Sequence, residues 1–188
     1  MKKGWIVVIA IVAVAAIWLA TGYNSLVKEE EGVKTAWSQV ENQYQRRSDL
    51  IPNLVNTVKG YASHESQTLE GVVAARARAT QTTVDAENLT PETLALYQAA
   101  QALGRLLMIQ ESYPDLKANR NFSELQAQLE GTENRIATER RNFNNTAKAY
   151  NTRVRRFPTN LLAGMFGFRQ YPYFEAAEGS DKAPVVEF

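Results

Sequence analysis

A helical seam over residues 32–61 constrains the fold of this chain more than any other sequence feature. Apolar and aromatic residues recur there at alternating intervals of four and three, which places them on one side of an α-helix that faces other helices. Pro52 interrupts the backbone hydrogen bonding, but the spacing continues in register, which predicts a kinked helix and not a helix end. The seam consists of Val33, Trp37, Val40, Tyr44, Arg47, Ile51, Leu54, Val58 and Tyr61.

A second long helix is predicted from residue 121 to the pair Phe157–Pro158, with a capping box formed by Asn121 and Glu124 at its start. Two shorter helices are predicted at about 65–83 and 91–112. Short turns make consecutive helices antiparallel, so the fold class is all-α, an up-and-down four-helix bundle with two long and two shorter helices. The apolar row of the second long helix recurs every seven residues at Leu129, Ile136, Phe143, Tyr150 and Phe157, beside a companion row of Leu125, Thr132, Glu139, Thr146 or Ala147, and Val154.

Residues 4–20 form an uncharged apolar run with Trp5 and Trp18 near its two ends. The run spans about 25 Å as a helix, close to the ~30 Å hydrocarbon core of a bilayer once residues 21–23 contribute. A cleaved signal peptide is the alternative, but the run is long for one and Trp18 is bulky beside a cleavage site at Ala20. We therefore predict a single-pass anchor over residues 1–22 that continues into the first bundle helix, with Trp5 and Trp18 at the membrane interfaces.

The basic residues that flank the anchor favour one orientation slightly. Lys2 and Lys3 precede the anchor, and Lys28 and Lys34 follow it at a greater distance. Because basic residues concentrate on the cytoplasmic side, we expect a cytoplasmic N-terminus and an extracytoplasmic body.

Composition argues against most catalytic and metal sites. The chain has no cysteine and one histidine, which excludes thiol chemistry and disfavours zinc or haem, so we expect no metal and no cofactor. His64–Glu65 lacks the second histidine of a zinc-protease helix, and no Gly-x-Ser-x-Gly motif is present, so we expect no enzyme. A net charge of +1 gives no drive toward nucleic acid.

The unequal helix lengths predict an exposed apolar surface near the membrane. Helices of ~35 residues are about 50 Å long and those of ~20 residues about 30 Å, so the shorter pair covers only half of the longer pair. Trp37, Val40 and Phe143 are then incompletely buried, as in an interaction surface. The surface predicted to mediate self-association or partner binding consists of Val33, Trp37, Val40, Phe143, Tyr150 and Val154.

The aromatic segment 158–174 leaves the bundle at the same membrane-proximal end. Aromatic side chains beside arginines suit a membrane interface, with rings at the headgroups and cations near the phosphates. Folding back to plug the end of the bundle, or contact with a protein partner, are the alternatives. The interfacial candidates are Arg153, Arg155, Arg156, Leu161, Leu162, Phe166 and Phe168.

Two further features have structural and binding interpretations. Arg47 and Glu139 occupy facing seams, which predicts a buried ion pair that fixes helix register, with ligand binding as the alternative. The tail 175–188 ends in an apolar tip of Val185, Val186 and Phe188, which suits docking of a C-terminal tether into a partner's groove or onto its own bundle.

The chain resembles the LemA family along essentially its whole length. The resemblance rests on the lysine-led anchor, the string RRSDLIPNLV at 46–55, VKGYA at 58–62, FGF at 166–168 and APVVEF at 183–188. It implies a bacterial, membrane-anchored protein with an up-and-down four-helix bundle and no established biochemical activity. We assign the bundle to residues 23–157 and expect the anchor to lie in the inner membrane. The resemblance leaves the orientation open, since an outer N-terminus has been proposed for such proteins.

These observations predict a non-enzymatic, membrane-anchored scaffold or adaptor that forms homo-oligomers or binds a membrane protein partner. The alternative is a lipid-interacting protein that shapes or senses the bilayer through its aromatic segment. A ligand-sensing bundle is a third reading. Expected contacts are membrane lipids and protein, and not nucleic acid.

Overall fold

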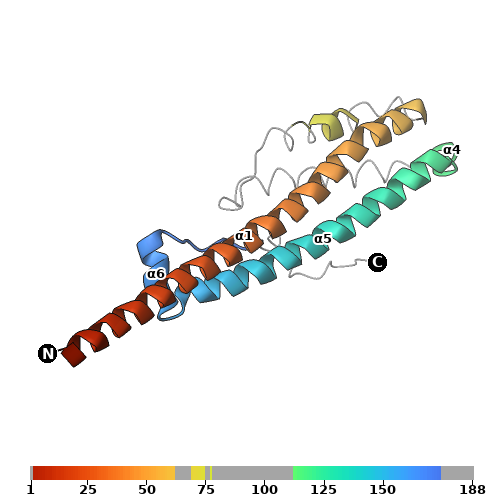
Figure 1. The fold of residues 1–188 in the computed structure, drawn as a ribbon. Coiled ribbons are helices and arrows are strands. Elements are labelled where there is room, and N and C mark those ends of the chain that lie inside the picture. Colours follow the sequence, from red (N-terminus) through yellow and green to blue (C-terminus); the bar gives the residue numbers. More distant parts are fainter. Residues whose placement is uncertain (1, 62–68, 75–76, 78–111, 175–188) are drawn as a thin grey trace, which may run out of the picture.

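The computed structural model describes residues 2–61, 69–74, 77 and 112–174, and within these ranges it is helical and contains no strand (Figure 1). The prediction of an all-helical chain with a long N-terminal apolar helix is confirmed. Residues 91–111 of the predicted helix at 91–112 and the tip at Val185, Val186 and Phe188 lie outside the described residues. The helices are α1 (Lys2–Tyr61), α4 (Pro114–Lys117), α5 (Arg120–Arg155) and α6 (Thr159–Phe166).

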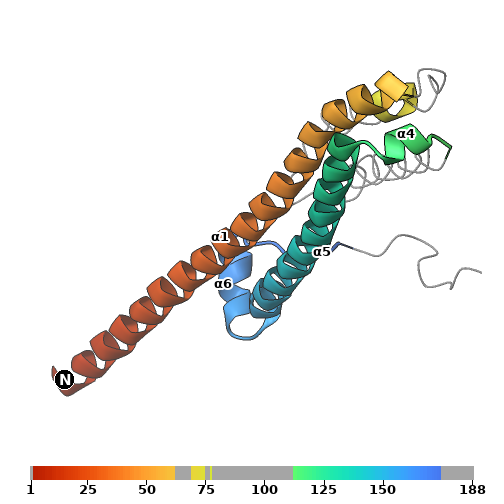
Figure 2. The same cartoon turned by 90° about the vertical axis from the view of Figure 1, so that its right-hand side faces the viewer.

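Helix α1 unites the predicted anchor and the first bundle helix in 60 residues, about 90 Å long. It continues through Pro52, as the unbroken seam predicts. Its N-terminal part projects beyond the rest of the molecule (Figure 2), and it is long and apolar enough to cross a membrane. The continuous helix gives the body a fixed direction relative to the anchor.

Helix α5 runs antiparallel to α1, and the two seams face each other along most of its length (Figure 1). Tyr61 and Phe157 depart from the prediction, because both are exposed; α5 ends at Arg155, before Phe157. Most of the other predicted seam positions form the core, including Val33, Trp37, Val40, Arg47, Ile51, Leu54 and Val58 of α1 and Leu129, Thr132, Ile136, Phe143, Ala147, Tyr150 and Val154 of α5.

The distal end of the helix pair is closed by a second core cluster and a polar cap. Leu69 and Val72, in the described part of the predicted second helix, pack there with Leu116. Asn119, and not Asn121, caps α5, because its Oδ1 accepts from the Phe122 N–H at 3.0 Å. Its Nδ2 donates to the Tyr61 hydroxyl at 2.8 Å, which ties the end of α1 to the start of α5.

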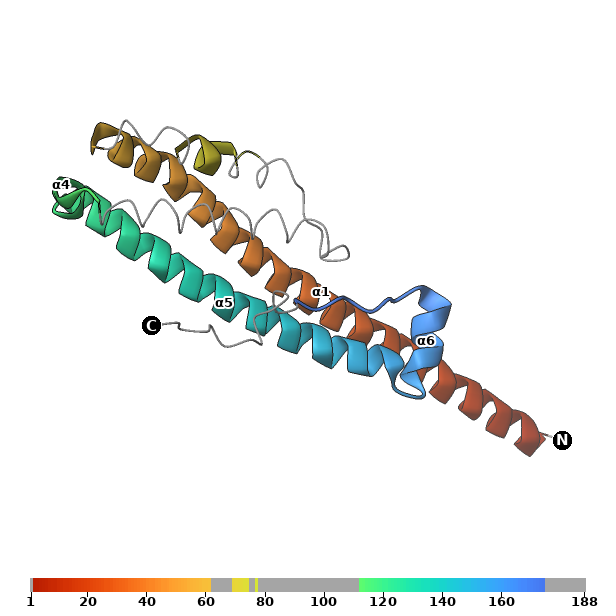
Figure 3. The same cartoon turned by 180° about the vertical axis from the view of Figure 1, so that it is seen from behind.

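Residues 168–174, which we call the return arm, run back from α6 along the groove between α1 and α5 (Figures 2 and 3). The arm corrects the prediction that Trp37, Val40 and Phe143 are incompletely buried. They are 5%, 0% and 0% exposed, because Tyr171 and Phe174 of the arm complete the membrane-proximal core.

Candidate functional site

Helix α6 is docked on α1 where the apolar run ends. Leu162 packs so closely on Gly22 that an added Cβ there would lie 2.6 Å from Leu162 Cδ1. The ring of Tyr23 contacts the rings of Phe166 and Phe168, with centroids 4.9 and 5.7 Å away. Leu162 is therefore buried against α1 and does not face lipid, which corrects its prediction as an interfacial contact.

The outer side of α6 nevertheless carries large apolar side chains that the protein leaves exposed. Leu161 is 58% exposed, Met165 69% and Phe166 51%, and Phe157 just before the helix is 75% exposed. We call these four residues the α6 apolar face. Large exposed apolar side chains that gather on one part of a monomer are typical of a site that a membrane or another molecule covers.

The α6 apolar face lies at the depth expected of a bilayer surface. From Gly4 to Val27 the chain carries no charge, and these 24 residues span about 36 Å, slightly more than the ~30 Å hydrocarbon core. Gly22, the docking point, is 18 residues from Gly4, or about 27 Å along the axis. Helix α6 therefore meets α1 at the edge of the expected hydrocarbon layer.

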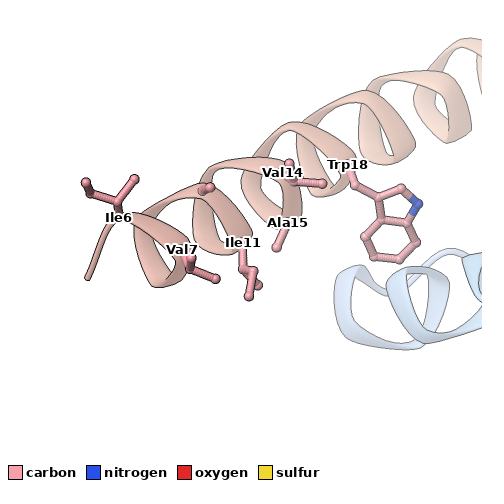
Figure 4. A pocket seen from close by; sticks show the side chains of 7 residues that line it. Ile6, Val7, Ile11, Val14, Ala15 and Trp18 are labelled. Carbon is pink, nitrogen blue, oxygen red and sulfur yellow. The ribbon is translucent and has the colours of Figure 1, made fainter. Parts of the chain in front are cut away.

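The anchor itself offers an open apolar surface on the same end of the molecule. A shallow depression on this surface is lined by residues of α1 only. Figure 4 shows that Trp18 projects from α1 toward the blue ribbon of the α5–α6 end. Trp18 is 41% exposed and Trp5, near the other end of the run, is exposed too. The lining residues are Ile6, Val7, Ala10, Ile11, Val14, Ala15 and Trp18.

Basic residues flank α6 in the sequence. No Asp or Glu occurs between Glu139 and Glu175 in the sequence, and Arg155 and Arg156 are exposed directly before α6. Arg153, by contrast, donates to Glu29 of α1 at 2.6 Å, so it ties the two helices together. Of the three predicted interfacial arginines, the structure therefore gives Arg153 a structural contact and leaves the other two exposed to solvent.

The return arm places Phe174 in an aromatic cluster between α1 and α5. Its ring stacks on Trp37 and meets Phe143 edge-on, both with centroids 5.5 Å away. The guanidinium of Arg140 lies 4.7 Å from the Phe174 ring centroid, a cation–π distance. The six residues predicted as an association surface are therefore core residues of one chain, with Val154 the most exposed at 8%.

Arg47 forms its ion pair with a different carboxylate from the one predicted. Its Nη1 lies 2.9 Å from Oε1 of Glu133, whereas Glu139 accepts a hydrogen bond from Asn142 on its own helix. The guanidinium also lies 5.0 Å from the ring centroid of Tyr44. Burial raises the pKa of the Tyr44 hydroxyl, while Arg140 and Arg47 lower it and Glu133 raises it.

Sequence reasoning missed the residues that hold the return arm. Asn144 and Asn151 of α5 bind its main chain, and they lie one heptad apart, each directly after a buried aromatic residue of the seam. This heptad spacing was the sequence signal that could have identified the two asparagines as binding residues. Among the described residues, no group of three His, Cys, Asp or Glu side chains is placed to hold a metal ion.

Comparison with known proteins places this architecture in a family. The model of the LemA family matches residues 36–188. The protein named Magnetosome protein MamQ 2 of Paramagnetospirillum magneticum is 29% identical over 209 residues, which cover 96% of this chain and 75% of that protein. Protein LemA of Metamycoplasma hominis is 25% identical, over 82% of this chain and 69% of that protein. Magnetosome protein MamQ of Magnetospirillum gryphiswaldense is 26% identical, over 87% and 68%.

Proposed function

This chain belongs to the LemA family, and we propose that it is a non-enzymatic scaffold attached to the bilayer at two points, through α1 and through α6. The body is the antiparallel pair α1 and α5, which presents a rod of fixed direction to a second copy or to a membrane protein partner. The observation that carries the proposal is the α6 apolar face at the level of Gly22, near the end of the uncharged stretch of α1 from Gly4 to Val27.

A second attachment point restricts the position of the rod on the membrane more than a single anchor does. A single transmembrane helix can shift in depth and tilt, whereas a docked second element in the interface restricts both. The tight contact of Leu162 with Gly22 and of Phe166 with Tyr23 supports a rigid connection between the two elements. A scaffold needs this control because its partners are held in the same plane.

A second candidate function is sensing or shaping of the bilayer, and the charge around α6 favours it. Arg155 and Arg156 stand beside an apolar face, the combination that binds anionic lipid surfaces. Vesicles with and without anionic phospholipid distinguish the candidates: a sensor changes the depth of α6 with lipid charge, and a scaffold keeps it constant.

For the membrane we propose a bacterial inner membrane, with the body outside the cytoplasm. Lys2 and Lys3 support this orientation under the positive-inside rule.

The absence of native cysteine allows a direct test of the second attachment point. We expect an environment-sensitive fluorophore on Leu161→Cys or Met165→Cys of the full chain, reconstituted in vesicles, to be blue-shifted and quenched by spin-labelled lipid. The matched control is Ser123→Cys, an exposed position at the far end of α5, where no quenching is expected. Equal quenching at all three positions, or none, would remove the basis of the proposal.

The scaffold role itself is tested by crosslinking in native membranes followed by mass spectrometry. A photoreactive residue at an exposed position of the rod, such as Ser123 or Lys148, is expected to yield a discrete protein partner or a second copy. Lipid adducts alone would favour the lipid-interacting candidate.

A further inference from the structure

Two asparagines of α5 hold the main chain of the return arm with paired hydrogen bonds. Asn151 Nδ2 donates to the Tyr171 carbonyl at 2.8 Å, and the Tyr171 N–H donates to Asn151 Oδ1 at 2.9 Å. Asn144 does the same at Phe174, with distances of 2.9 and 2.8 Å. Each carboxamide therefore satisfies both main-chain groups of one arm residue, and none of these four bonds depends on the arm's side chains.

The spacing of the two asparagines matches an extended peptide. Seven residues of α-helix rise about 10.5 Å, and three residues of polyproline II helix rise about 9 Å. Because that helix has three residues per turn, every third residue presents its main chain on the same side. Pro172 between the two contact residues favours this backbone.

The side chains of Tyr171 and Phe174 fill aromatic positions between the two long helices. The Tyr171 ring lies edge-on to Tyr150, with centroids 5.5 Å apart, and its hydroxyl approaches Glu30 of α1. Phe174 stacks on Trp37 and contacts Phe143. The two asparagines bind the main chain of the arm, and the aromatic residues of the helices contact every third side chain. A peptide-binding groove combines these two kinds of contact.

We propose that this groove is a peptide-binding site whose partner ligand is the return arm of a second copy, exchanged between neighbouring chains. The inference deepens the proposed scaffold role, on which it rests, by naming the partner and the contact. In an exchanged pair the same hydrogen bonds and ring contacts form between two copies. The contacts that an arm loses in its own chain are therefore made again in the neighbouring chain.

Three features of the molecule favour exchange over release. Departure of the arm without replacement would uncover the ring surfaces of Trp37 and Phe143 that Phe174 now contacts. Phe168 is held by its N–H bond to Ala163 of α6 and by its ring contact with Tyr23, so residues 169 and 170 form the connection to Tyr171, which spans up to about 11 Å, comparable to the ~8–10 Å between the axes of packed helices. The shared anchor holds every groove and every arm at the same height, which raises their effective concentration.

The first experiment measures the groove directly. A fluorescent peptide of residues 168–174 is added to full-length Tyr171→Ala/Phe174→Ala protein in lipid nanodiscs, and anisotropy is recorded. We expect saturable binding that weakens at least tenfold when Asn144→Ala and Asn151→Ala are added to the same chain. The matched control, Asn142→Ala/Asn145→Ala on the exposed side of α5, should keep the affinity. Absence of saturable binding overturns the groove as a peptide site.

The second experiment tests exchange between copies. Two differently tagged full-length variants are coexpressed, one with Asn144→Ala/Asn151→Ala and one with Tyr171→Ala/Phe174→Ala. Only the mixed pair retains one intact arm and one intact groove, so we expect at least tenfold more copurification across variants than within either one. Equal recovery across and within variants overturns exchange, as does a wild type that stays monomeric or recovers a different protein in place of its second copy.

Folding and the two proposals are kept apart by further readouts. Circular dichroism identifies any variant that loses helix, and the milder single substitutions Asn144→Ala and Phe174→Leu then take the place of the pairs. The fluorophore at Met165→Cys reports α6 in the membrane whether or not the arm exchanges. Failure of exchange with normal α6 depth therefore rejects this inference alone.

Discussion

Among single residues, Arg47 carries the sharpest energetic consequence, because its buried guanidinium pairs with Glu133 across the α1–α5 seam. Glu133→Ala removes a partner of a buried charge and is expected to destabilise the protein by about 1–3 kcal/mol, since Glu133 is itself half exposed. Adding Arg47→Met removes the charge as well and should recover most of that loss. Thermal unfolding in detergent measures both.

Glu139 supplies the matched control for this ion pair. Its carboxylate accepts from Asn142 of the same helix, so Glu139→Ala should change stability by no more than about 0.5 kcal/mol. A larger loss in Glu139→Ala than in Glu133→Ala would contradict the assignment of the pair.

Tyr44, whose ring lies beside Arg47, should make stability depend on pH above about 10. Burial raises the pKa of its hydroxyl, so the folded chain keeps this proton to higher pH than the unfolded chain, in which tyrosine titrates near pH ~10. The stability contribution is therefore complete below that pH and is lost as the pH rises toward the folded-state pKa. Tyr44→Phe should flatten the fall of Tm above about pH 10. Parallel curves for Tyr44→Phe and wild type would count against this account.

At the scale of elements, the docking of α6 on α1 depends on the absence of a side chain at Gly22. A methyl group there would lie 2.6 Å from the buried Leu162, so Gly22→Ala should loosen α6. We expect trypsin to cleave after Arg155 and Arg156 several-fold faster in this variant in nanodiscs. Gly164→Ala on α6 is the control, because its added methyl meets no atom within 4 Å. Equal cleavage of the two variants would show that Gly22 does not set the docking.

The sequence predicted the long elements well because their spacing reports directly on burial. The intervals of four and three from Val33 to Val58 required one helix face to be covered, and the structure buries that face. The same spacing carried the helix past Pro52, because a helix held by packing on both sides tolerates one lost hydrogen bond.

The candidate sites were predicted less completely, for physical reasons. A seam states which residues need covering but not which segment covers them, so Trp37 and Phe143 were expected to be exposed when the return arm in fact covers them. Heptad register likewise does not fix how far a long side chain reaches, so Arg47 pairs with Glu133 and not Glu139. Asn144 and Asn151 resemble solvated helix positions until an extended segment lies against them.

For the whole molecule, the orientation of the rod decides which compartment its distal end enters. Helix α5 is 36 residues long, so its start lies about 50 Å from the α6 end. Lys2 and Lys3 favour a cytoplasmic N-terminus, but the fold also brings Arg155 and Arg156 to the anchor from a distant part of the sequence. The positive-inside rule counts basic residues near the span in the sequence, so we expect the two lysines to prevail.

A single cysteine at the distal end tests this orientation in intact cells. The full chain has no native cysteine, so a membrane-impermeant maleimide can react only with Ser123→Cys, and we expect labelling before permeabilisation. Permeabilised cells give the maximum signal and the wild type gives the background. Labelling that requires permeabilisation would place the body in the cytoplasm, and it would mean that the arginines gathered by the fold outweigh Lys2 and Lys3. Arg155→Gln/Arg156→Gln should then restore labelling of intact cells.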